Sequence, residues 1–309
     1  MRKSVILPGV AVVGGLAGLA VRWLYLTRGF APGTGLPVSG SPTPWLMVLV
    51  VAAVVVIPLA LGRGKHQVFD RCYTGAFASD SLPCLSGMLA GAVLLAVGGF
   101  LALALWVSSP MDPITNQRSM SAAWLVTGIL CLLGAAGIYF VTQKMRQGKP
   151  ILTAWVVTPG FACALWVMAN YHQNWAEEPI LGHYWVPMLA AALSLVACFL
   201  VAGFAFDKGR VPVTQTVCVA AAALDIMSLA DGLSLADTAL YLAMMFYLAS
   251  MASSLAANDA KGAQQPLCAT FCQSCAGCAP MGTMPPKEKK KKKKKGETGD
   301  NTPDAPVSP

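Results

Sequence analysis

The sequence predicts an all-α fold: a polytopic integral membrane bundle of about eight transmembrane helices, followed by a disordered C-terminal tail. Three observations lead to this prediction. Hydrophobic residues make up 56% of the 309 residues, charged residues only 12%, and the mean hydropathy is +0.60. Soluble domains carry about 25% charged residues, so this chain has too little charge to cover a water-exposed surface. The stretches between charges also reach the roughly 20 apolar residues that a helix needs to cross a bilayer.

Trimming these stretches at Pro, Gly and polar residues predicts eight spans within a bundle of residues 1–256. Helices are expected because backbone amides in lipid must bond within their own segment. Runs such as Val48–Ala60 also lack the alternation of a membrane β-barrel. The seventh span is the weakest, because it meets Asp225 before its end. The predicted spans are approximately residues 5–24, 44–62, 85–107, 121–143, 151–169, 185–206, 211–230 and 236–256.

The distribution of Lys and Arg predicts a multi-pass protein of the cell membrane with both termini in the cytoplasm. Before the tail, ten of these residues fall on one side of the predicted bundle, and only Arg22, Arg28 and Arg118 fall on the other. Positive residues concentrate in cytoplasmic loops. Six of the eight Trp residues border the poorly charged side, as expected for a residue that prefers the membrane interface. The first span also resembles a signal peptide, but its apolar run continues past Arg22, which favours retention.

Two alternatives exist for the acids of the last two spans. In the first, Asp225, Asp231 and Asp237 share a cation or proton site, because ionisable residues inside a membrane commonly mark function. In the second, which the sequence favours, the seventh span ends earlier and all three acids are hydrated loop or cap residues. Pro159 and Gly160, in the fifth span, are a further candidate, since a broken helix presents carbonyls and helix ends to a solute. Their alternative is ordinary helix packing.

Eight of the ten cysteines fall into two groups. Four lie singly on predicted spans, where we expect them to pack as small apolar residues: Cys131, Cys163, Cys198 and Cys218. Another four lie close together in the predicted tail: Cys268, Cys272, Cys275 and Cys278. Four thiolates at this spacing can bind zinc or an iron–sulfur cluster, although the order of the gaps differs from the usual ferredoxin pattern. The alternative is a flexible thiol-rich segment that binds no metal.

The predicted cytoplasmic tail, residues 257–309, also carries a run of lysines. Its polar, charged composition cannot bury a core, which is typical of disorder. We expect the run to contact anionic lipid at the membrane surface, and nucleic-acid binding is not expected because no aromatic residue interleaves the lysines. The lysines concerned are Lys287, Lys289, Lys290, Lys291, Lys292, Lys293, Lys294 and Lys295.

The sequence leaves three classes of function open. A transporter or channel for a small solute or ion ranks first, because of the span number, Pro159-Gly160, and the recurrence of Ala104–Val107 as Ala164–Val167. A non-catalytic membrane sensor, scaffold or assembly component, acting with a protein partner or a second copy, is the alternative. A membrane-embedded enzyme of unknown chemistry comes third, since no familiar catalytic motif is present. A polar mid-membrane cavity at Thr158, Asn170 or Asp225 would favour transport, and a packed apolar bundle would favour the partner class.

Overall fold

The computed structural model describes residues 3–31, 36, 38, 40–62, 64, 66, 69–70, 72–79, 81–111, 119–147, 151–175, 180–206 and 208–261. In this part of the chain, eight helices are long and apolar enough to cross a membrane, which confirms the predicted fold class. They are α1 (Lys3–Arg28), α2 (Thr43–Leu61), α4 (Leu82–Ser108), α5 (Ala122–Gln147), α6 (Thr153–Asn170), α7 (Leu181–Phe206), α8 (Val211–Ser228) and α9 (Leu235–Lys261). The chain is therefore a multi-pass membrane protein.

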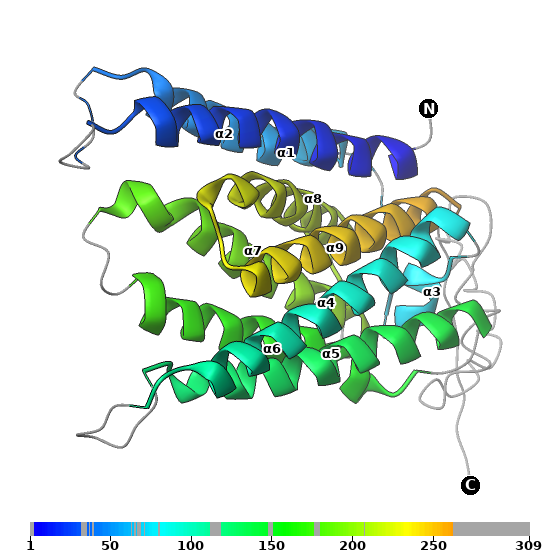
Figure 1. The fold of residues 1–309 in the computed structure, drawn as a ribbon. Coiled ribbons are helices and arrows are strands. Elements are labelled where there is room, and N and C mark those ends of the chain that lie inside the picture. The colour runs from blue at the N-terminus through cyan, green and yellow to red at the C-terminus, as the bar shows by residue number, and fades with distance from the viewer. Residues whose placement is uncertain are drawn as a thin grey trace, which may run out of the picture.

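The helix ends differ from the predicted spans by a few residues. The largest extension is in α9, which continues five residues beyond 256 and reaches Lys261. Because the number of spans is even, Lys3 and Lys261 lie at the same end of the bundle (Figure 1). We call this the terminal end and the opposite one the far end. Which end faces the cytoplasm stays a prediction.

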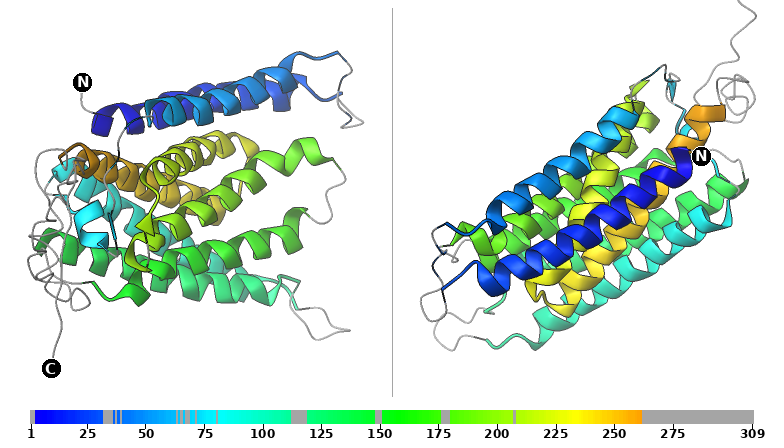
Figure 2. Two further views of the ribbon diagram at one scale, coloured as in Figure 1. Left: turned by 180° about the vertical axis from the view of Figure 1, so that it is seen from behind. Right: turned by 90° about the horizontal axis from the view of Figure 1, so that it is seen from above.

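Six helices form a ring. Each packs on the next in the order α4, α5, α6, α7, α8 and α9, and α9 closes the ring by packing on α4. Helices α6 and α9 face one another across the ring interior, where the centroids of the Trp166 and Tyr241 rings lie 4.6 Å apart. Helix α1 packs outside on α8 and α9, and α2 packs on α1 and α8, so that the two form a separate layer (Figures 1 and 2).

A glycine allows a close helix approach between α4 and α9. A Cβ atom placed on Gly91 would lie 3.0 Å from the carbonyl oxygen of Ala243 and 3.1 Å from the amide nitrogen of Tyr247. Backbone therefore meets backbone at this point, and only glycine fits without separating the helices. No side chain separates α4 from α9 at Gly91.

A short buried segment at the terminal end was not predicted. Helix α3 (Tyr73–Phe77) follows strand β1 (Phe69–Asp70), which pairs antiparallel with β2 (Lys208–Gly209). All five α3 residues are buried. The Asn258 side chain of α9 donates to the carbonyls of Ala76 and Ala78, at 2.9 and 2.7 Å. The segment thus covers the terminal end of the ring with its polar backbone satisfied (Figure 1).

Two of the Trp residues that the sequence assigns to the membrane interface lie elsewhere. Trp124 and Trp166 are 2% and 1% exposed, so they belong to the core. Trp23 and Trp45 are 60% and 78% exposed on the outer layer, where an interfacial position remains open to them. The Trp pattern therefore supports the predicted orientation less than the Lys and Arg count does.

Candidate functional site

One face of α9 carries polar or sulfur-bearing side chains along the whole span. Seven of them recur at intervals of three or four residues, each at most 3% exposed: Asp237, Tyr241, Met244, Tyr247, Met251, Ser254 and Asn258. We call this set the polar face of α9. At 1.5 Å per residue it extends for about 30 Å, the thickness of a bilayer hydrocarbon core. Leu240, Leu248 and Leu255 lie on the same side of the helix, so apolar side chains are interspersed among the polar ones.

Asp237 begins the polar face at the far end. Ser234 caps the start of α9: the Asp237 amide donates to Ser234 Oγ at 3.1 Å, and Ser234 Oγ donates to the Asp237 carboxylate at 2.7 Å. Trp166 Nε1 and Asn170 Nδ2 of α6 also donate to the carboxylate, at 2.9 and 3.0 Å. The local sequence thus fixes where α9 begins, and the two donors from α6 hold its first acid inside the ring.

Two further groups continue inward from Asp237. The Tyr241 hydroxyl donates to the Pro187 carbonyl of α7 at 2.8 Å. Beside them, Ser194 Oγ of α7 donates to both carboxylate oxygens of Asp225 in α8, at 3.1 and 3.0 Å. Ser194 and Asp225 are both 0% exposed. Asp225 is thus an acid packed inside the membrane bundle, bonded to one hydroxyl.

Asp231 lies outside the ring and joins α1 to the end of α8. It belongs to a 3₁₀ turn (Leu229–Asp231), and its Oδ1 accepts a 2.8 Å bond from Arg22 Nε and a second bond from Arg22 NH2. The same guanidinium donates to the carbonyls of Gly182 and His183, at 2.8 and 2.7 Å. Arg22 is therefore a fully buried clamp between three helices rather than a loop residue.

These positions correct the interpretation that the sequence favours for the three acids. None of them is hydrated: Asp225 and Asp237 are 0% and 3% exposed, and the Asp231 side chain is 4% exposed. Asp237 is a cap residue, but a buried one, and α8 does not end before Asp225. The acids also have separate partners, and the described residues contain no group of three or more His, Cys, Asp or Glu side chains that could hold a metal ion. The structure therefore does not join them into one shared metal site.

The proposed break at Pro159 and Gly160 is absent, because α6 runs without interruption through both residues. Both are buried. A Cβ atom on Gly160 would contact the Cβ of Cys198 at 3.6 Å and the Phe199 ring at 3.5 Å. Gly160 thus packs against α7 at ordinary van der Waals distance, which is the packing alternative.

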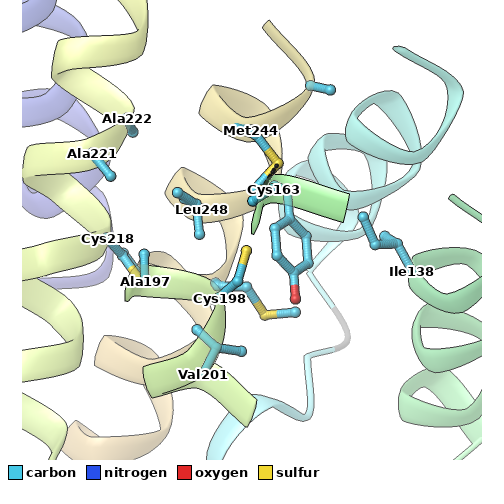
Figure 3. Close-up of a cluster of buried hydrophobic side chains, with 14 of the residues drawn as sticks. Ile138, Cys163, Ala197, Cys198, Val201, Cys218, Ala221, Ala222, Met244 and Leu248 are labelled. Atoms are coloured by element: carbon cyan, nitrogen blue, oxygen red, sulfur yellow. Dashed lines mark hydrogen bonds between the residues drawn. The ribbon is translucent and has the colours of Figure 1, made fainter. Parts of the chain in front are cut away.

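The cysteines of the spans do not all lie singly. The Cys163 thiol of α6 contacts the Met244 sulfur of α9 at 3.7 Å, and the Cys198 side chain of α7 lies next to it. In Figure 3 a dashed line joins Cys163 to Met244, Cys198 lies near them, and Cys218 lies apart on the α8 side. All four cysteines of the spans are free and lie in the hydrophobic core, which agrees with the expected apolar packing. The contact of Cys163 with Met244 was not predicted.

The polar face ends beneath α3. Ser254 Oγ bonds the Cys84 thiol of α4 at 2.6 Å, and Asn258 holds α3 as described above. Beside them, burial raises the pKa of the Tyr73 hydroxyl above its usual value, so this group stays protonated at neutral pH. The terminal end is thus closed by neutral groups, and Ser254 and Asn258 hold them in place by hydrogen bonds.

The four tail cysteines, Cys268, Cys272, Cys275 and Cys278, lie outside the described residues, as do the lysines from Lys287 to Lys295. Zinc or iron–sulfur binding and lipid contact by this segment stay predictions. The polar face of α9 was missed at the sequence level, although one signal could have revealed it. Asp237, Met244, Met251 and Asn258 recur every seven residues through a segment that is otherwise rich in Ala and Leu.

Comparison with known proteins gives no independent indication of function. No family model matches the sequence, no curated protein is significantly similar to it, and no solved structure matches the chain significantly.

Proposed function

We propose that this protein is a transporter that carries a small cation through the interior of the six-helix ring, along the polar face of α9. The observation that carries the proposal is the length of that face. Polar groups are costly inside a membrane, and those that persist there commonly line ion pathways or proton relays. Here five polar side chains and two methionines follow one helix face for about 30 Å, from Asp237 to Asn258.

Charge favours a cation over an anion on this path. The acids Asp237 and Asp225 lie in the far half of the ring, and Tyr241 and Ser194 supply oxygen atoms beside them. The buried Arg22 is already paired with Asp231 outside the ring. A cation that enters from the far end therefore meets carboxylates first, and these lower its electrostatic cost in the low-dielectric interior.

In the present conformation the path is closed. Asp225 and Ser194 are 0% exposed. The space between Cys131, Cys163 and Met244 is too small to hold a water molecule. Transport consequently requires the ring helices to separate in turn at the far and terminal ends. Alternating movement of helix groups around a central site is the usual device of secondary transporters.

Flux measurements in vesicles test this proposal. The purified full chain is reconstituted, and uptake of H⁺, Na⁺, K⁺ and Cu⁺ is followed with vesicle-trapped indicators against protein-free vesicles. We expect one of these cations to move faster with the protein, and Asp237→Asn to lower that rate at least tenfold. Asp259→Asn is the matched control, because Asp259 bonds His66 at 2.8 Å away from the ring interior. Its flux should equal that of the unmodified chain.

The second candidate is a non-catalytic sensor, scaffold or assembly component. The observation that favours it is the packed interior, since Asn170 and Asp225 are buried instead of lining an open polar cavity. Under this alternative the polar face holds the helices in register and moves no ion. Vesicles in which none of the four cations moves faster than in protein-free controls would refute the transport proposal and leave this candidate.

A further inference from the structure

Four sulfur atoms gather near the middle of the ring, each from a different helix. Cys131 comes from α5, Cys163 from α6, Cys198 from α7 and Met244 from α9, and all four residues are at most 2% exposed. Cys163 occupies the centre, with its thiol 3.7 Å from the Met244 sulfur. The Cys198 side chain of α7 lies next to it. Cys131 borders the same small gap as Cys163 and Met244.

The chemistry of these donors selects soft metal ions. Thiolates and thioethers prefer Cu(I), whereas Na⁺, Mg²⁺ and Ca²⁺ prefer oxygen ligands. Zinc usually takes four ligands from Cys, His, Asp and Glu. The described residues contain no such group of three or more, and Met244 is not one of these ligand types. Two thiols and a thioether therefore fit a monovalent soft cation better than zinc.

The charge balance also suits a buried location. When Cu(I) binds, a Cu–S bond forms to one cysteine, its thiol proton passes to the solvent buffer, and the metal keeps its oxidation state. One thiolate, one thiol and one thioether around a monovalent cation make a neutral unit. Neutral units avoid the large cost of burying net charge in a low dielectric. Sodium or potassium at the same place would find no oxygen ligand among these three side chains.

We infer that Cys163, Cys198 and Met244 form an intramembrane binding site for a soft monovalent cation of the Cu(I) class. The inference rests on the proposed function, because it names the class of cation carried along the polar face of α9. The site lies between the acids of the far half and the Ser254–Asn258 segment of the terminal end.

Metal binding to the purified full chain tests the site without requiring transport. The four tail cysteines are first replaced by serine, so that only the cysteines of the bundle remain available. The protein is then titrated anaerobically with Cu(I) in competition with bathocuproine disulfonate. We expect about one Cu(I) per chain and an X-ray absorption spectrum with a sulfur-only first shell, as soft-ligand selection requires.

Three variants in this background locate the metal. Cys163→Ser with Cys198→Ser should lose the bound Cu(I), whereas the matched control Cys218→Ser should keep it, because Cys218 is equally buried but lies apart on α8. Met244→Leu leaves both thiols in place and should reduce the number of sulfur neighbours from about three to about two, since Met supplies one of the soft ligands. It tests the same site if the double serine variant fails to fold.

Two results would overturn the inference: no Cu(I) retained by the protein with the serine tail, or retention of the metal at unchanged affinity by both the double serine variant and Met244→Leu. Failure of the proposed function has a different signature. A chain that binds Cu(I) at this site but moves no cation in vesicles keeps the site and loses the transporter. A chain that moves H⁺ but binds no Cu(I) keeps the transporter and loses the site.

Discussion

Replacing Arg22 with Met should destabilise the bundle strongly, because it removes one partner of a buried ion pair. Asp231 would keep its carboxylate at 4% exposure, with Oδ2 already lacking a hydrogen-bond partner. The carbonyls of Gly182 and His183 would also lose their bonds from the guanidinium. Breaking a buried pair from one side costs about 3–5 kcal/mol. We therefore expect a loss of about 4 kcal/mol, since the two carbonyl bonds act in the same direction.

Reversible unfolding in mixed detergent and SDS micelles, followed by Trp fluorescence, measures this loss. Arg28→Met is the matched control: Arg28 is exposed on the same helix, so its free energy of unfolding should change by less than about 0.5 kcal/mol. Arg22→Met combined with Asp231→Leu should regain most of the stability, because a buried pair is replaceable by apolar residues of similar volume. An Arg22→Met protein within 1 kcal/mol of the unmodified chain would contradict the clamp, as would a double variant no more stable than the single one.

Two more predictions concern packing and the α3 segment. Gly91→Ala should destabilise the protein by about 1–3 kcal/mol in the same unfolding assay, because the new methyl group meets the backbone of α9. The control Gly9→Ala has no atom within 4 Å of the new carbon, so it should be neutral or stabilising by up to about 1 kcal/mol. Asn258→Leu removes both donors to α3, a loss of about 2 kcal/mol, and should speed maleimide labelling of the fully buried Cys72 at least tenfold, measured by mass spectrometry of its peptide. Equal destabilisation by the two glycine variants, or an unchanged Cys72 rate, would contradict these assignments.

The eight spans were predictable because each depends on its own segment. A helix in lipid satisfies its backbone internally, so a long charge-free run is sufficient to identify it. The rule fails where a charge finds a partner on another helix. Asp225 marks a predicted end of the seventh span, but Ser194 of α7 bonds its carboxylate and α8 continues past it. The sequence likewise assigns Arg22 to the membrane boundary at the far end, because its partner Asp231 on another helix cannot be recognised there. In the structure this ion pair holds Arg22 inside the bundle.

The candidate site was predictable only in part, because its components meet through tertiary packing. Asp237 is identifiable from its position three residues after Ser234, because a serine followed by an acid at this spacing is a local capping signal. Cys163 and Cys198 are distant in sequence, and they come together only because α6 packs on α7. Helix α3 is too short to show a hydrophobic period, and its burial depends on Asn258, 182 residues away from Ala76. No sequence pattern in residues 69–79 indicates that Asn258 is their partner.

The clamp between Arg22 and Asp231 has a consequence for biosynthesis. The two residues are 209 positions apart in the chain. A ribosome that feeds helices into the bilayer in order delivers the guanidinium long before its carboxylate has been translated. Until then Arg22 must remain near a headgroup or a wet surface, with the first hairpin held loosely beside the insertion machinery. Docking of that hairpin is therefore a late event, completed only when the turn that precedes the last span emerges.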